Sequence, residues 1–362
     1  MLKILGFETL CATSLFFIHD SGNPNLILVY VSRVLFYYFS LDPQQIVDFI
    51  PGLLPLRAAD LPQSVLMHPS FAVELKKNMS QGAGTILNTV YELERKALDA
   101  ISQRIPVYPI GPMLLMSNPL QTTIVRDTIA LWAEDRECLG WLDTALPSSV
   151  LFVSFGSLAN MSVYQLKEIA EGLEASEQPF LWVIRSNAVE GHMWSSVLPE
   201  GFMERTKGRG LIISWAPQLE VLSHPSVGGF LTHCGWNSIT ENLSTGCVPM
   251  LCWPQIAEQR LNARILVDEW RVGLDIEVPR RNGENIVKSS TIERAVVELM
   301  QGDTGKEIKK RTLALKEVVS QSVQEGGSSH RYRRTLVEDL KKTCHIFRVK
   351  TDIEREELGD LV

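Results

Sequence analysis

Residues 215–259 have the sequence WAPQLEVLSHPSVGGFLTHCGWNSITENLSTGCVPMLCWPQIAEQ, which combines apolar strand patterns with the turns that follow them. The run Gly229–Thr232 predicts a buried strand, and His233-Cys234-Gly235-Trp236 predicts the turn after it. Asn237 and Ser238 have the side chains of helix caps, so a helix is expected to follow. A strand, a turn and a helix N-terminus in this order are typical of a parallel sheet that binds phosphate at its carboxyl edge.

The same alternation of strand and helix patterns extends on both sides of this stretch. Ser162 and Gln165 predict a capping box, and an apolar helix face follows them at Leu166, Ile169, Ala170 and Leu173. Further strands are predicted at Val150–Phe155, Phe180–Ile184, Leu211–Ser214 and Met250–Trp253. Further helices are predicted at Gln218–Ser223, Asn237–Ser244, Glu258–Glu269, Thr291–Met300, Gly305–Val319 and Ser328–Lys342. This pattern predicts an α/β fold with a doubly wound parallel sheet.

The first third of the chain is less regular. A strand at Gly84–Val90 and a helix at Tyr91–Ala100 precede a stretch rich in proline and glycine. A length of 362 residues fits two domains. We therefore expect a partial N-terminal lobe over 1–115, a linker over 116–145, a C-terminal lobe over 146–330, and a C-terminal helix and tail over 331–362.

Composition excludes several classes of function. The net charge is −7, and the one basic cluster, His330–Arg334, is too short to follow a nucleic-acid backbone. The apolar patches at 4–18 and 26–39 are both shorter than the ~20 residues of a membrane span. Buried elements of a soluble lobe are the preferred interpretation of these patches, with a signal peptide as the alternative.

The six cysteines indicate free thiols in a reducing cytoplasm, because none forms a Cys-x-x-Cys pair. A zinc site built from His224, His233, Cys234 and Cys247 lacks the usual ligand spacing, so no metal site is expected.

Several residues of the 215–259 stretch suit a nucleotide sugar. Trp215 offers a flat face for a base, and Glu241 can accept hydrogen bonds from ribose hydroxyls. His233 adds a donor, and when protonated a charge, beside the expected anion. Glu258 and Gln259 present a carboxylate and an amide that suit the vicinal hydroxyls of a sugar. Each residue alone has a structural explanation, so the functional interpretation depends on the whole set.

That set resembles the signature box of plant family 1 UDP-glycosyltransferases. The matching residues are Trp215-Ala216-Pro217-Gln218, His224, Thr232 to Ser238, Glu241, Gly246, Pro249 and Glu258-Gln259. Further matches lie at Asp48–Gly52, Asn88-Thr89, Cys138–Asp143, Val153–Ser157 and Glu325–Ser329, so the resemblance spans about 48–343. It implies a GT-B fold, in which two Rossmann-like lobes face a cleft.

The resemblance also implies a role for each residue of the donor site. Trp215 would stack on uracil, the Ala216 backbone would bond the base edge, and Gln218 and Glu241 would hold the ribose. The diphosphate would contact Ser157, His233, Asn237 and Ser238, and the sugar would contact Trp236, Glu258 and Gln259. Gln259 at the end of the box favours UDP-glucose as co-substrate.

The expected reaction is inverting transfer of a hexose to a hydroxyl of a small lipophilic acceptor, such as a phenolic or terpenoid of plant secondary metabolism. No Asp-x-Asp motif occurs in the chain, so no metal cofactor is expected. We expect a monomer without a membrane span or a nucleic-acid partner.

The catalytic base is not identified. The family places a histidine after the first strand, and neither His19 nor His68 follows a strand with that pattern. His19 is the weak candidate, although its neighbour Asp20 would point the opposite way on an extended segment. We therefore expect that the start of the N-terminal lobe is lacking and that turnover is reduced by about 10²–10⁴.

Two departures from the family pattern affect the sugar site. Gly246-Cys247-Val248-Pro249 contains one residue more than the usual Gly-Val-Pro, and Glu258 replaces the common aspartate. The extra residue should be absorbed in the turn, but it could displace Glu258 and Gln259.

Three alternative functions remain. The first is a UDP-sugar-binding fragment with little or no activity. The second is a nicotinamide-dependent oxidoreductase, but Gln81-Gly82-Ala83-Gly84 lacks the required glycine pattern after a strand. The third is a membrane-anchored hexosyltransferase, but residues 351–362 are acidic and polar.

Overall fold

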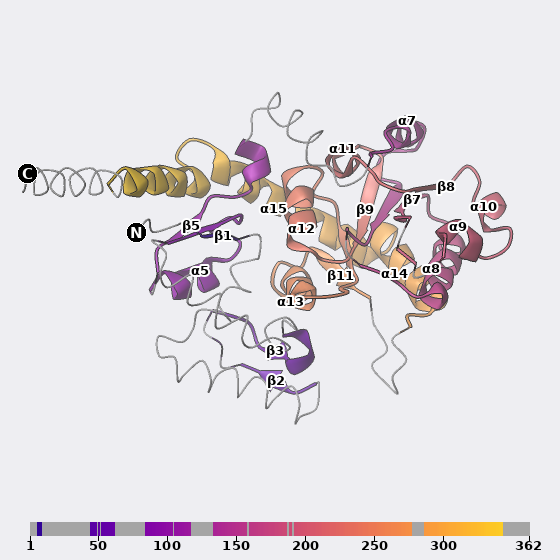
Figure 1. Cartoon of the computed structure of the whole chain (residues 1–362), viewed down its shortest axis with the longest axis horizontal. Coiled ribbons are helices and arrows are strands. Elements are labelled where there is room, and N and C mark those ends of the chain that lie inside the picture. The colour runs from indigo at the N-terminus through magenta and orange to yellow at the C-terminus, as the bar shows by residue number, and fades with distance from the viewer. Residues whose placement is uncertain are drawn as a thin grey trace, which may run out of the picture.

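The protein is described by a computed structural model over residues 6–8, 44–48, 50, 52–61, 84–103, 105–116, 133–157, 159–186, 188–189, 192–276 and 286–342. Two parallel sheets, each with its own helices, form two lobes within this part of the chain (Figure 1). None of the helices in the described ranges is long and apolar enough to cross a membrane.

The larger lobe is built on six parallel strands. They are β6 (Val150–Ser154), β7 (Phe180–Val183), β8 (Gly210–Ile213), β9 (Val227–Thr232), β10 (Met250–Cys252) and β11 (Gly273–Asp275). Their order across the sheet is β11-β10-β9-β6-β7-β8. The chain adds β7 and β8 on one side of β6 and then β9, β10 and β11 on the other, so the switch point lies between the parallel neighbours β6 and β9. Ligands of such folds bind beyond the carboxyl ends of the strands at this switch point.

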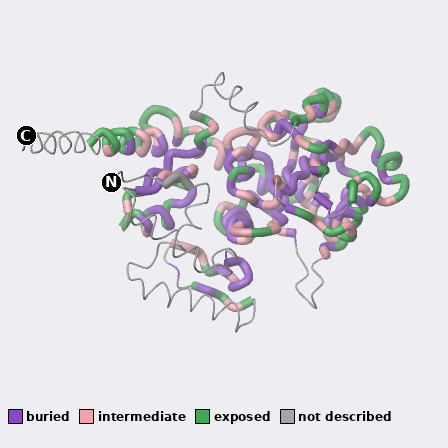
Figure 2. The backbone as a smooth tube through the Cα atoms, in the orientation of Figure 1, coloured by how far each residue is buried: buried purple, intermediate pink, exposed green. Residues whose placement is uncertain are grey.

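Helices cover both faces of this sheet, and the strands are apolar on both sides as a result. Along β6, Leu151 and Val153 pack with α8 (Val163–Ala175) and α14 (Ser289–Met300), whereas Val150 and Phe152 pack with the helices of the other face. The other face carries α11 (Gln218–Ser223), α12 (Trp236–Ser244) and α13 (Gln259–Arg264). Figure 2 shows the buried centre of this lobe and the exposed outer turns.

The smaller lobe contains the parallel strands β1 (Gly6–Glu8), β4 (Thr85–Leu87) and β5 (Val107–Pro109), in the order β1-β4-β5. Helix α5 (Arg95–Ser102) connects β4 to β5 and buries Ala97, Leu98 and Ile101. A short hairpin pairs β2 (Ile46–Val47) with β3 (Leu56–Arg57), and the 3-10 turn η1 (Ala58–Asp60) follows it.

The remaining elements connect the two lobes or decorate the larger one. They are η2 (Met113–Met116), α7 (Glu137–Asp143), α9 (Trp194–Val197), α10 (Phe202–Arg205), the π-helical turn η3 (Ile265–Glu269) and α15 (Asp303–Val323). After α15 the helical residues 328–342 return to the smaller lobe (Figure 1). There Tyr108 donates its hydroxyl to Asp339 Oδ2 at 3.0 Å, and Ser329 Oγ donates to the Gly111 carbonyl at 2.5 Å.

The predicted strands and helices of the larger lobe are confirmed within a few residues, with two corrections. Ser162 caps α8 and accepts from the Gln165 amide at 3.1 Å, but the reciprocal half of the capping box is absent. The Gln165 side chain instead exchanges two hydrogen bonds with the Val287 backbone at 2.8 and 2.9 Å. The predicted helix Glu258–Glu269 is divided into α13 and η3. The domain boundaries given above remain predictions.

Candidate functional site

The donor-site residues predicted from the sequence gather at the carboxyl edge of the larger sheet. Ser157 follows β6, Trp215 follows β8, His233 follows β9, and Glu258 follows β10. Because these strands are parallel, their carboxyl ends lie on one edge, and the β6 and β9 ends meet at the switch point.

The N-terminus of α12 is open. The structure corrects the predicted cap, because α12 begins at Trp236 and its N-cap residue is Gly235, which has no side chain to accept a hydrogen bond. Asn237 and Ser238 lie inside the first turn; Asn237 is exposed and Ser238 is buried. The first N–H groups of a helix have no intrahelical partner, and the helix dipole favours an anion beside them. This end of α12 therefore suits a phosphate.

His233 fills the space between the β6 and β9 connections. A Cβ atom on Gly156 would lie 2.5 Å from its Nε2 atom, and one on Gly235 would lie 2.3 Å from the same atom. Gly156 also has a φ of 73°, which favours glycine. Both positions therefore need glycine for the imidazole to lie there.

Burial lowers the pKa of His233 to about 4, and the backbone of Ser154 acts weakly in the opposite direction. The Nδ1 atom is buried and has no hydrogen-bond partner among the described residues. The ring is therefore neutral near pH 7 in the unliganded protein. The sequence suggested that His233 could carry a positive charge. In the folded protein such a charge requires a further group that stabilises the imidazolium.

The candidate nucleoside site lies between α11 and α12. Gln218 Nε2 donates to Ser238 Oγ at 3.0 Å and to Glu241 Oε2 at 2.5 Å. Trp215 is half-buried, and Ala216 beside it is buried. The structure thus brings together the predicted base platform and the predicted ribose carboxylate.

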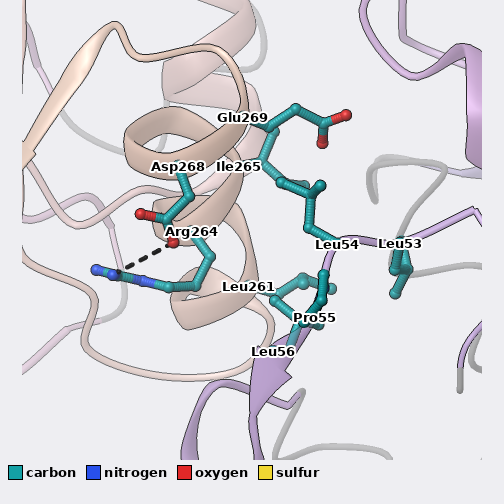
Figure 3. A pocket seen from close by; sticks show the side chains of 9 residues that line it. All are labelled: Leu53, Leu54, Pro55, Leu56, Leu261, Arg264, Ile265, Asp268 and Glu269. Carbon is teal, nitrogen blue, oxygen red and sulfur yellow. Dashed lines mark ion pairs between the residues drawn. The ribbon is translucent and has the colours of Figure 1, made fainter. Parts of the chain in front are cut away.

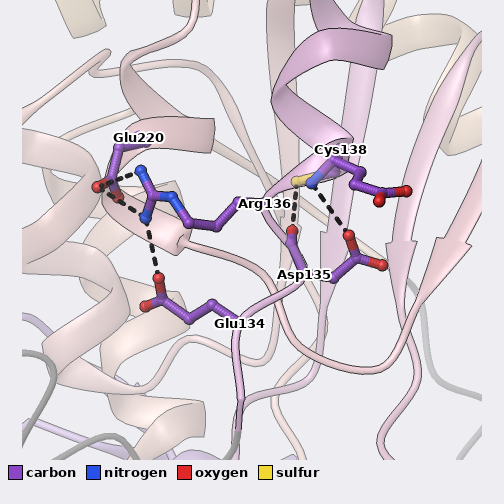
Figure 4. A network of polar contacts seen from close by, with 6 residues as sticks. Glu134, Asp135, Arg136, Cys138 and Glu220 are labelled. Carbon is purple, nitrogen blue, oxygen red and sulfur yellow. Dashed lines mark hydrogen bonds and ion pairs between the residues drawn. The ribbon is translucent and has the colours of Figure 1, made fainter.

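The segment before α7 supports Trp215 from outside the signature box. The Asp135 amide donates to the Trp215 carbonyl at 2.9 Å, and Asp135 also accepts from the Cys138 thiol and the Glu137 amide. Figure 4 shows the contact of Asp135 with Cys138, and Arg136, which contacts Glu220 on α11 at 3.5 Å. Asp135 received no role from the sequence, because its contact with Trp215 is made through the backbone.

Trp236 joins the two lobes. Its indole Nε1 donates to the Asn88 carbonyl after β4 at 3.0 Å, and only 3% of the residue is exposed. The neighbouring Trp270 donates from Nε1 to the Leu93 carbonyl at 3.0 Å, and the two indole rings lie 6.1 Å apart. The indole N–H of Trp236 is thus bonded to the smaller lobe. The part of Trp236 that can contact a ligand at the α12 N-terminus is its backbone.

Glu258 and Gln259 begin α13 and differ in their environments. Burial raises the pKa of Glu258, with hydrogen bonds from its own backbone and from Asn262 acting in the opposite direction. The Gln259 Oε1 atom accepts from the Gln255 and Ile256 amides, each at 2.9 Å, and so shapes the loop after β10. Asn262 Nδ2 donates to the Cys234 carbonyl at 2.9 Å and ties α13 to the turn that contains His233.

The extra residue of the signature box is absorbed before β10. Cys247 takes a positive φ of 50° and is buried, and its thiol donates to the Thr312 carbonyl at 3.0 Å. Asn242 holds the turn by exchanging hydrogen bonds with the Val248 backbone at 2.9 and 3.1 Å. The pairing of β10 with β9 is regular, with Met250 opposite Phe230. The insertion therefore does not shift the strand that leads to Glu258.

A separate pocket lies between the β2–β3 connection and α13 (Figure 3). It is lined by Leu53, Leu54, Pro55, Leu56, Leu261, Arg264, Ile265, Asp268 and Glu269. None of the predicted donor-site residues lines it. The described ranges contain no group of three side chains arranged to hold a metal ion. His19 and His68 lie outside the described residues.

Gly156 and Asn262 are site residues to which sequence reasoning gave no role. The glycine was visible in Val153-Ser154-Phe155-Gly156-Ser157, but its purpose requires His233 from another strand. Asn262 follows Glu258 by one helical turn, which is the spacing that places both on one face.

Comparison with known proteins identifies the family of the chain. Residues 136–314 match the family model for UDP-glucoronosyl and UDP-glucosyl transferase. The chain is 41% identical to 7-deoxyloganetin glucosyltransferase of Catharanthus roseus, over 84% of this chain and 62% of that protein. It is 39% identical to UDP-glycosyltransferase 76B1 of Arabidopsis thaliana, over 83% of this chain and 65% of that protein.

A solved structure agrees as well. Phytolacca americana UGT2, complexed with UDP-2fluoro-glucose and pterostilbene, superimposes with a TM-score of 0.76 at 33% identity. The match covers 92% of this chain and 70% of that one.

The two lobes built on parallel sheets, together with the similarity to this solved structure, define a GT-B protein. The chain belongs to the UDP-glycosyltransferase family of plants. It spans slightly under two thirds of the length of the curated relatives that it matches.

Proposed function

We propose that this protein transfers a hexose from a UDP-sugar to a hydroxyl group of a small lipophilic acceptor, with inversion at the anomeric carbon. The open N-terminus of α12, with His233 held against it by two glycines, carries this proposal. The leaving diphosphate needs stabilisation of its negative charge, and a helix N-terminus and a histidine at the switch point can provide it. No Asp-x-Asp motif accompanies them, which supports a reaction without a metal.

The nucleoside would lie against Trp215, with its ribose hydroxyls on Glu241. Gln218 already donates to Glu241 at 2.5 Å, so the carboxylate is oriented before ligand arrives. The Asp135 amide fixes the Trp215 backbone, which limits the entropy lost when a base stacks on the ring. Ser157, Asn237 and Ser238 would complete the contacts to the diphosphate.

Glucose is the proposed sugar, on the basis of Gln259 at the end of the signature box. The Gln259 carbonyl oxygen holds the loop after β10, so its amide N–H groups are the part of the side chain that would reach a sugar hydroxyl. Glu258 would accept from a second hydroxyl. Its raised pKa reflects a partly dry position in which such a bond is strong.

The proposed acceptor is a phenolic or terpenoid alcohol in the plant cytoplasm, bound by a monomer. Pterostilbene in the Phytolacca complex and 7-deoxyloganetin in the name of the Catharanthus relative define the first compounds to test. The four described cysteines are unpaired, which fits a reducing compartment. No residue is assigned as the catalytic base, because His19 lies outside the described residues.

The test is acceptor-dependent release of UDP from UDP-glucose by the purified 362-residue chain, with UDP binding measured separately by calorimetry. UDP release that needs an acceptor, together with a glucosylated product, would support the transferase. UDP binding without release by any acceptor would limit the function to donor binding. A folded chain that does not bind UDP would contradict the proposal.

A further inference from the structure

The two nitrogen atoms of the His233 ring lie in different surroundings. Nδ1 is buried and has no hydrogen-bond partner among the described residues. Nε2 lies between the β6 and β9 connections, where a Cβ on either Gly156 or Gly235 would be within 2.5 Å of it. The Nε2 side of the ring therefore borders the two backbone turns that frame the open N-terminus of α12.

No charged side chain in the described part of the chain compensates a proton on this ring. The end of β6 and its connection contribute the Ser154 backbone and Ser157, and the β9 connection contributes Cys234, which does not act on the charge of His233. Two carboxylates stand nearby in the candidate site, but Glu241 on α12 is bonded to Gln218, and Glu258 at the start of α13 does not act on His233. Burial alone thus keeps the ring neutral, with a pKa of about 4.

A bound diphosphate changes this balance, because it places negative charge beside a ring on which no charged side chain acts. A neutral imidazole has one N–H group, so it cannot donate from both nitrogens at once. An imidazolium can donate from both, and it also meets the anion with a positive charge.

We propose that binding of the UDP-sugar is coupled to uptake of one proton from solvent by His233, which converts the imidazole to an imidazolium against the diphosphate. The inference rests on the proposed function, because it requires the nucleotide to occupy this edge of the sheet. In the step a ring nitrogen gains an N–H bond, the buffer loses the proton, and no other bond changes. Without the donor the His233 ring stays neutral, and its positive charge forms only when the donor is present.

The size of the effect follows from the distance of the charges. An opposite charge within about 4–6 Å moves the pKa of a neighbouring group by about one to three pH units. The pKa of His233 would then rise from about 4 to roughly 5–7 in the complex. At about pH 6 the complex takes up roughly 0.1–0.9 of a proton, and at about pH 8 less than ~0.1.

Isothermal titration calorimetry of the full chain with UDP-glucose tests this coupling. UDP-glucose is used because its diphosphate, esterified at both ends, does not titrate near neutral pH, so any proton taken up belongs to the protein. Titrations at about pH 6 in MES and in Bis-Tris, which differ in ionisation enthalpy, give the number of protons bound. The slope of log Kd against pH for the same protein must give the same number.

Three variants assign the proton. His233→Gln keeps a hydrogen-bonding side chain but cannot be protonated, so its uptake should fall below ~0.1 while weaker binding persists. His192→Gln removes an exposed histidine of the same lobe, and Glu258→Gln removes the other group of the site whose pKa is shifted. His192→Gln should retain both the affinity and the proton uptake of the unmodified chain. Glu258→Gln alters a proposed sugar contact and should bind UDP-glucose more weakly, but it should retain the same proton uptake per bound ligand.

The outcomes separate this inference from the proposed function. Uptake by the unmodified chain that agrees in the two buffers and in the pH slope, and that disappears in His233→Gln, supports the proposal. UDP-glucose binding without buffer-dependent heat overturns the coupling and leaves the donor site intact. Uptake that persists in His233→Gln or disappears in Glu258→Gln overturns the assignment to His233. Absence of UDP-glucose binding to the folded chain overturns the proposed function and the coupling together.

Discussion

Two helices on opposite faces of the larger sheet begin after adjacent parallel strands, yet their N-termini differ. Helix α8 follows β6 and is closed by Ser162, whose hydroxyl accepts from the Gln165 amide. Helix α12 follows β9 and begins at Trp236, and its N-cap residue Gly235 has no side chain. A closed end satisfies the helix internally, whereas an open end leaves donors and a partial positive charge for a ligand. The difference supports the proposal that α12, and not α8, faces the diphosphate.

The largest expected effect comes from Gly235→Ala, which places a methyl group against His233 at the open end of α12. The φ of Gly235 is −65°, so alanine costs no backbone strain there, but its Cβ would lie 2.3 Å from His233 Nε2. Displacement of the ring from the turn should weaken UDP binding by about 100-fold or more, since charged hydrogen bonds contribute ~1.5–3 kcal/mol each. Calorimetry with UDP measures this loss.

Gly140→Ala is the matched control for this substitution. Gly140 lies in α7 and a Cβ there meets nothing within 4 Å, so UDP affinity should be unchanged and stability slightly increased. Unchanged UDP affinity in Gly235→Ala would show that the diphosphate binds elsewhere.

The next largest effect distinguishes the contribution of the base to UDP affinity from that of the phosphates. Trp215→Ala removes the proposed stacking platform, which is worth about 1–3 kcal/mol, and should weaken UDP binding by roughly 5- to 150-fold. Uridine, which has no phosphate, should lose a similar factor with Trp215→Ala and little with Gly235→Ala. Competition of uridine against UDP measures both. Equal losses of uridine affinity in the two variants would contradict the assignment of α12 to phosphate.

The sequence predicted most of the larger lobe because its strands and helices alternate with clear apolar patterns. It failed at the start of α12, since the choice between Gly235 and Asn237 as the cap depends on where the chain turns. Cys234, with a φ of 63°, makes that turn, and a cysteine side chain does not predict a left-handed backbone conformation. The capping box failed because the partner of Gln165 is Val287, which is remote in sequence.

The candidate site was predictable in its residues but not in its electrostatics. The resemblance to the signature box brought Trp215, Gln218, His233 and Glu241 into one site, and the structure places them on one edge of the sheet. The neutral state of His233 depends on burial against Gly156, which belongs to a different strand. Burial by distant segments of the chain cannot be read from a local motif.

A smaller effect concerns pH and the stability of the unliganded protein. The folded His233 has a pKa of about 4, below the ordinary value of 6.5, so the unfolded chain binds more protons between these values. The contribution of the neutral ring to the free energy of unfolding is therefore fully present above pH 6.5. It falls by roughly 1–3 kcal/mol as the pH decreases toward 4. Thermal unfolding across this range should show a steeper loss for the unmodified chain than for His233→Gln. Parallel curves for the two proteins would contradict a His233 ring that folding keeps neutral.

The smallest effect tests the closed end. Ser162→Ala removes the hydroxyl that accepts from the Gln165 amide at 3.1 Å and should cost about 1 kcal/mol of stability, as loss of an N-cap does. For a domain of this size that corresponds to a decrease in Tm of about 2–4 °C. UDP affinity should not change, because the Ser162 hydroxyl acts on the Gln165 amide of α8 and not on the start of α12. Thermal unfolding and UDP calorimetry on the same sample measure both quantities. A loss of UDP affinity in Ser162→Ala as large as that in Gly235→Ala would mean that the two helix ends act together on the diphosphate, and the contrast between an open and a closed end would no longer explain the site.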